Sequence, residues 1–107
     1  MKRWEFTKNL IQILFEMELN GHKPIIDFAL RSTEEQKRLF DKGLSKCDGS
    51  LKISNHQRGL AADIYLTDSN GNIQFDWDKD KADYYHNRWI QLGGKPMIIG
   101  DSGHFDA

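Results

Sequence analysis

Two short segments of this 107-residue chain carry side chains of the kinds that bind metal ions. The segment SNHQRGLAADI contains His56 and Asp63, and the segment DSGHF contains Asp101 and His104. A catalytic zinc ion takes three ligands from His, Asp or Glu and leaves a fourth position for water, whose pKa it lowers to roughly 7. His56, Asp63 and His104 supply three such ligands, and Asp101 supplies a spare carboxylate that could take a proton from that water. This set is typical of a zinc hydrolase.

The spacing within the first segment favours a loop followed by a strand. His56 and Asp63 are seven positions apart, so on a continuous helix they would lie about 10 Å apart along the axis. Gly59 permits a positive φ between them, and the apolar run AADIYL around Asp63 has strand character. An unpaired carboxylate buried in such a strand would be costly, and a bound metal removes that cost. His104 lies in a second extended piece, GHFD, which could pair beside the first.

The other histidines, the acidic stretch near residue 78 and the cysteine are expected to lie outside the metal site. His22 lies in the turn NGHKP and His86 on a helix, and we expect both on the surface or just outside the ligand set. The acidic stretch FDWDKDKAD lacks the glycine and terminal glutamate of a calcium loop, which favours a solvated helix start. Cys47 is the only cysteine and is expected to be a loop thiol. The alternative is a cysteine hydrolase that uses Cys47 with His56, in which Asp63 orients the histidine.

These motifs resemble a known family, the zinc D,D-carboxypeptidases and L,D-endopeptidases that cut peptidoglycan stem peptides. That family shares its fold with lysostaphin and the Sonic hedgehog N-terminal domain. The family pattern is S-x-H-x-x-G-x-A-x-D, followed later by an acid, two residues and a His. Every fixed position is met, by Ser54, His56, Gly59, Ala61, Asp63, Asp101 and His104. An earlier element, an Arg-Ser with a Gln five positions after the Arg, is present as Arg31, Ser32 and Gln36, so the resemblance runs from about residue 25 to residue 106.

The resemblance implies a role for each matched residue. It implies one zinc ion at the open face of a sheet. The implied ligands are His56, Asp63 and His104. Asp101 is expected to be the general base, and Arg31 to stabilise the anionic tetrahedral intermediate. Ser54 and Gln36 match positions that contact substrate in relatives.

The resemblance also implies a substrate, the peptidoglycan stem peptide, cut at either a D-Ala-D-Ala or an L-Ala-D-Glu bond. Two positions depart from the family. Asp106 replaces the usual Glu after the final His-Phe, and Gly100 replaces an aromatic residue found in many relatives. The alternative to a peptidase is a catalytically silent zinc-binding module that recognises cell wall or a protein partner, as the hedgehog branch shows for this fold. Retention of Asp101 and Arg31 argues against that alternative.

Composition and charge are those of one small domain, residues 1–107. The formal net charge is −1, from 15 basic and 16 acidic residues, and no basic run supports a nucleic-acid partner. No segment is apolar enough for a membrane span, and the N-terminus is too charged for a signal peptide. We therefore expect a monomer made in the cytoplasm that reaches the cell wall after release by another factor, as in phage or prophage lysis.

The elements that must position these side chains are predicted from apolar periodicity and turn residues. Residues 4–19 are expected to form a helix packed on the core; a membrane-surface helix is disfavoured because its polar face mixes charges. A loop without helical or strand periodicity is expected from Leu44 to Ile53, and a hairpin turn at Asp68–Gly71. The other expected elements are strands at 25–30, 61–66, 72–75 and 103–106 and helices at 34–43 and 78–92. The predicted fold is α+β, a small, mostly antiparallel sheet that carries the zinc site, with helices packed against it.

Overall fold

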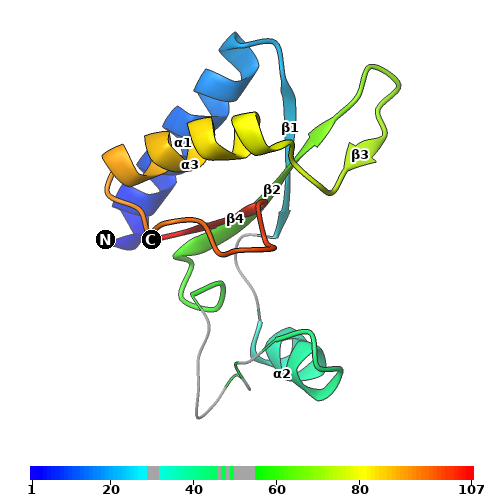
Figure 1. The fold of residues 1–107 in the computed structure, drawn as a ribbon. Coiled ribbons are helices and arrows are strands. Elements are labelled where there is room, and N and C mark those ends of the chain that lie inside the picture. Colours follow the sequence, from blue (N-terminus) through cyan, green and yellow to red (C-terminus); the bar gives the residue numbers. More distant parts are fainter. Residues whose placement is uncertain (29–31, 46, 48, 50–54) are drawn as a thin grey trace.

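The computed structural model describes residues 1–28, 32–45, 47, 49 and 55–107 of the chain. Within these residues, helices and an antiparallel sheet alternate along the chain (Figure 1). The elements are α1 (Arg3–Leu19), β1 (Lys23–Phe28), α2 (Thr33–Asp41), β2 (Ala61–Thr67), β3 (Ile73–Gln74), α3 (Lys79–Gln91) and β4 (His104–Asp106). The predicted α+β class is confirmed. None of the helices in the described residues is long and apolar enough to cross a membrane.

Strand β2 is the centre of the sheet. It pairs with β1 along one side, from Lys23 opposite Thr67 to Phe28 opposite Asp63. On the other side it pairs with β3 at its end and with β4 at its beginning, each in antiparallel register. Pro24 has no backbone N–H, and its place in β1, which among the described residues pairs on one side only, is where a sheet tolerates proline.

The two faces of the sheet differ because side chains alternate along β2. Ala62, Ile64 and Leu66 are buried under α1 and α3, which lie together on one side of the sheet (Figure 1). Asp63 points to the opposite, open face. Helix α2 lies apart from α1 and α3, beyond that open face (Figure 1).

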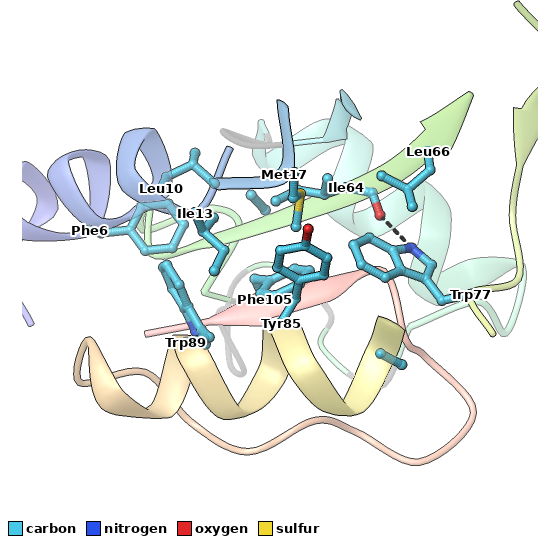
Figure 2. Packing of buried hydrophobic residues seen from close by; sticks show 12 residues of the cluster. Phe6, Leu10, Ile13, Met17, Ile64, Leu66, Trp77, Tyr85, Trp89 and Phe105 are labelled. Carbon is cyan, nitrogen blue, oxygen red and sulfur yellow. Dashed lines mark hydrogen bonds between the residues drawn. The ribbon is translucent and has the colours of Figure 1, made fainter. Parts of the chain in front are cut away.

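The core lies between the sheet and the two helices. Figure 2 shows the packing of its aromatic and aliphatic side chains around Phe105 of β4. The buried contributors from the helices are Phe6, Leu10, Ile13 and Met17 of α1 and Ala82, Tyr85 and Trp89 of α3. Two indoles also bind the backbone, since Nε1 of Trp77 donates to the Ile64 carbonyl at 3.1 Å and Nε1 of Trp89 to the Asp106 carbonyl at 2.7 Å. The core therefore fixes the positions of β2 and β4 from the side of the sheet opposite the open face.

The helix and turn signals read from the sequence are found at the expected positions. The Ser32 hydroxyl caps α2 by accepting from the Glu35 N–H, and the Asp78 carboxylate caps α3 by accepting from the Lys81 N–H. Asp68 closes the hairpin turn by accepting from two backbone N–H groups, and Gly71 there has φ of 82°. Strand β1 begins two residues earlier than predicted, and residues 29–30 at the end of the predicted strand lie outside the described part of the chain.

Candidate metal centre

Asp63 and His104 face each other across two neighbouring strands. The register of β2 and β4 pairs Asp63 with His104 and Ala62 with Phe105. Because successive side chains alternate, Ala62 and Phe105 enter the core while Asp63 and His104 emerge on the open face. Oδ1 of Asp63 lies 3.1 Å from Nδ1 of His104. The carboxylate and the imidazole are therefore brought together by backbone pairing between segments about 40 residues apart in sequence.

His56 reaches the same place from a turn before β2. In this turn the Leu60 N–H donates to the Asn55 carbonyl at 2.8 Å, and Gly59 adopts φ of 68°. Only glycine takes that conformation without strain, and a Cβ here would also come within 2.7 Å of the Arg3 side chain. The turn leaves the His56 side chain buried, with only 4% of the residue exposed.

The three side chains form a nearly equilateral triangle of potential ligand atoms. Nε2 of His56 lies 3.3 Å from Nδ1 of His104 and 3.4 Å from Oδ1 of Asp63, and the third side is 3.1 Å. For bonds of about 2.0–2.1 Å, two corners of a zinc tetrahedron lie about 3.3–3.4 Å apart. Two imidazoles and a carboxylate in this arrangement match the ligand set of a catalytic zinc site, and they could hold a metal ion.

The charges at the site support one another. Burial disfavours ionisation of Asp63, but hydrogen bonds from His104 and His56 outweigh it and hold the pKa of this carboxyl well below its usual range. Burial also disfavours the charged form of His104, but the carboxylates of Asp106 and Asp63 outweigh it and raise the pKa of the imidazole to about 9. In the metal-free chain the site therefore holds a carboxylate and a protonated histidine, and a metal ion would replace that proton.

Asp106 and Asn55 form a support behind the ligands. Oδ2 of Asp106 lies 3.8 Å from Nε2 of His104, the ring nitrogen that faces away from Asp63. Oδ1 of Asp106 accepts a 2.5 Å hydrogen bond from the side chain of Asn55, the residue before His56. Such outer partners fix the ring orientation of a ligating histidine. In the sequence Asp106 stands out only as a departure from the family pattern, although its spacing of two from His104 on a strand puts both on one face.

Tyr65 is a second residue of the open face that sequence reasoning missed. It lies two positions after Asp63 on β2, and its ring stacks edge-on against Phe75 with centroids 5.2 Å apart. Burial raises the pKa of the Tyr65 phenol, and the nearby carboxylates of Asp63, Asp101 and Asp27 raise it further. The phenol therefore stays protonated and is a hydrogen-bond donor beside the site.

Asp101 lies in the turn that leads into β4. Its backbone is fixed, because its N–H donates to the Ile98 carbonyl and its carbonyl accepts from the His104 N–H at 3.1 Å. Its side chain is exposed and is not part of the ligand cluster in the described residues. This placement agrees with a carboxylate that stays unligated, and the role of general base remains a prediction.

His86 is buried beneath the same turn, just outside the ligand set, which is one of the two positions expected for it from the sequence. Its ring stacks on Phe105 with centroids 4.2 Å apart, and its Nε2 lies 2.6 Å from the Ser102 carbonyl. Burial lowers the pKa of His86, so the ring is neutral and Nε2–H donates to that carbonyl. The sequence contained the signal, because His86 follows Ala82 by four positions and precedes Trp89 by three on the buried stripe of α3.

Of the other predicted site residues, Arg31 and Ser54 lie outside the described residues. Gln36 is fully buried in α2, where its amide donates to the Ser45 hydroxyl at 2.6 Å and to the Cys47 carbonyl at 2.7 Å. In this structure Gln36 holds the segment after α2, and a contact with substrate remains a prediction. Gln57, next to His56, donates to Thr33 and to the Gly49 carbonyl and so links α2 to the turn that carries the histidine.

Comparison with known proteins identifies the fold. No family model matches the sequence, and no curated protein matches it. Among solved structures, the L,D-carboxypeptidase DacB from Streptococcus pneumonia matches 98% of this chain with a TM-score of 0.65 and 16% identity. The Serratia marcescens L-Ala D-Glu endopeptidase ChiX matches 78% of it with a TM-score of 0.57 and 21% identity. The chain has the fold of these two peptidases. It spans 65% of the length of each.

The ion pair between His104 and Asp63 predicts how the stability of the metal-free chain varies with pH. The pKa of His104 is raised from 6.5 to about 9 in the folded state, so its stabilisation is fully present below pH 6.5 and is lost as pH rises toward 9. We expect the free energy of unfolding, measured with urea in the presence of a chelator, to fall by about 2 to 3 kcal/mol across this window. A His104→Gln variant should lack this slope. Equal slopes in both proteins would contradict the pairing.

The position of Asp106 behind His104 predicts that mutation of Asp106 lowers metal affinity. Asp106→Asn removes the charge behind His104 while keeping the size of the side chain, and we expect zinc affinity to fall about 10- to 100-fold. Competition with a chromophoric chelator measures this change. Asp106→Glu restores the charge and should recover most of the affinity, and Asp41→Asn, an exposed acid on α2, should leave it unchanged. Equal affinity in the Asp106→Asn variant and the wild type would show that this carboxylate does not orient the ligand.

Proposed function

We propose that the chain is a zinc-dependent peptidase that hydrolyses peptidoglycan stem-peptide bonds, as a D-Ala-D-Ala carboxypeptidase or an L-Ala-D-Glu endopeptidase. The observation that carries this proposal is the convergence of His56, Asp63 and His104 within 3.4 Å of one another on the open face of the sheet. The likeness in fold to an L,D-carboxypeptidase and an L-Ala D-Glu endopeptidase supports it. The sequence motif that these ligands belong to supports it independently.

Each group at the site has a task in this reaction. A zinc ion, when bound, supplies Lewis-acid polarisation of a carbonyl and a water of lowered pKa. Asp101 accepts the proton of the attacking water and passes it to the leaving amine. Its fixed backbone and exposed carboxylate suit a group that must meet both water and substrate.

The anionic intermediate needs a positive partner. Arg31 is proposed for this role, because a guanidinium presents several N–H donors in a fixed plane. Ser54 and Gln36 are proposed to contact the substrate. The protonated phenol of Tyr65 on the same face adds a neutral donor beside the carboxylates.

The setting is also part of the proposal. Residues 1–107 would act as one peptidase domain on the cell wall, reached after release by another factor, as in phage or prophage lysis.

The proposal is tested by digestion of purified peptidoglycan with the zinc-loaded protein, with products resolved by mass spectrometry. We expect defined fragments that identify the bond cut, and a fall in rate of about 10² to 10⁴ for Asp101→Asn with zinc affinity retained. Asp80→Asn, an exposed acid on α3 on the opposite side of the sheet from the ligands, is the matched control and should digest normally.

The other outcomes separate the rival functions. Bound zinc without any fragment would indicate the silent binding module. Hydrolysis that resists a chelator but is lost on alkylation, or in a Cys47→Ser variant, would indicate the cysteine mechanism. Loss of hydrolysis with a chelator, and its recovery when zinc is added, would exclude the cysteine mechanism.

A further inference from the structure

Helix α1 carries two apolar stripes on opposite faces, and only one of them is used in the core. The buried stripe is Phe6, Leu10, Ile13 and Met17. The second, which we call the outer stripe, consists of Trp4, Ile11, Phe15 and Leu19, which are 65%, 63%, 57% and 73% exposed. At 100° per residue these positions lie about 180° from the buried stripe. A surface helix normally carries polar residues on that face, so the outer stripe points to a partner.

The outer stripe continues onto the sheet. Pro24 and Ile26 of β1 border it, and Ile26 is 47% exposed. Together with Ile11, Leu14 and Phe15 they line a groove of about 540 Å³ between α1 and β1. Figure 1 shows α1 on the same side of the sheet as α3. The metal ligands lie on the opposite, open face. A partner seated on the outer stripe would leave the metal centre accessible.

The charges on this face are arranged symmetrically about its middle. Lys8 lies three residues before Ile11, and Glu18 lies three residues after Phe15, so the four positions are symmetric about Ile13. Both charged residues are exposed and share the outer face. Their spacing of three, four and three residues is the a/d repeat of a coiled coil. When two such helices pack antiparallel, each lysine faces a glutamate, and each Ile11 faces a Phe15.

We propose that the outer stripe is the interface of a symmetric dimer, in which α1 packs antiparallel against α1 of a second copy. The geometry places Lys8 opposite the partner's Glu18 and Ile11 opposite the partner's Phe15, and each pair occurs twice because the interface is two-fold symmetric. A lipid surface fits less well, because the acidic Glu18 lies on the same face as the outer stripe and membrane-surface helices carry lysine-rich polar faces. The proposal is independent of the peptidase function.

Sedimentation velocity of the full chain from about 1 µM to about 1 mM tests the proposal. We expect a reversible monomer–dimer equilibrium in the wild type. Lys8→Glu and Glu18→Lys should each raise the dissociation constant about tenfold, because two attractive pairs become repulsive. An equimolar mixture of these two variants should dimerise again, because the facing charges are then opposite. Lys37→Glu on α2 changes the net charge equally and should have no effect.

The apolar part of the interface is tested by Phe15→Ser, which should leave a monomer at concentrations where the wild type is a dimer. The metal affinity of this variant serves as the check that it is folded. A wild type that stays monomeric throughout, as expected from the sequence, would overturn the proposal, as would a dimer unaffected by these variants. Binding of a monomeric wild type to phosphatidylglycerol vesicles would assign the outer stripe to a lipid surface and would equally overturn it.

Discussion

The antiparallel pairing of β2 with β4 determines where every other feature of the site can lie. In this register Asp63 faces His104 on the open side of the sheet while Ala62 and Phe105 fill the core. A slip by one residue would turn the apolar side chains outward and bury the carboxylate, so the core enforces the register that the site requires. The large aromatic side chains around Phe105 therefore influence the site by fixing the backbone of β4 (Figure 2).

The site combines groups that would be unfavourable separately. A half-buried carboxylate and two imidazoles lie in contact, and each is acceptable because the others supply the opposite charge or a hydrogen bond. Asp106 and Asn55 extend this network to the loop before β2, so the two histidines are tied to each other through a second path. A rigid frame with mutually compensating ligands is what a metal ion needs in order to bind without rearranging the protein.

Local signals predicted most of the fold, whereas several contacts between distant segments were not predictable. The α1 and α3 boundaries follow apolar periodicity and caps such as Asp78, and they were predicted to within one residue. The grouping of the ligands came from motif spacing. The contact of Asp106 with Asn55 joins a strand and a turn about 50 residues apart, and periodicity within one segment carries no record of it. The outer stripe of α1 was visible as apolar residues, but which stripe enters the core is decided by tertiary packing.

X-ray absorption at the zinc edge of the metal-loaded chain would examine the proposed centre itself. We predict a first shell of two imidazole nitrogens, one carboxylate oxygen and one further light atom at about 2.0–2.1 Å, with the outer-shell scattering of two histidine rings. His56→Ala should remove one ring from this pattern. A sulfur at about 2.3 Å would implicate Cys47, and a shell of six oxygens without imidazole would show that zinc binds elsewhere. Either result would contradict a metal centre built from His56, Asp63 and His104.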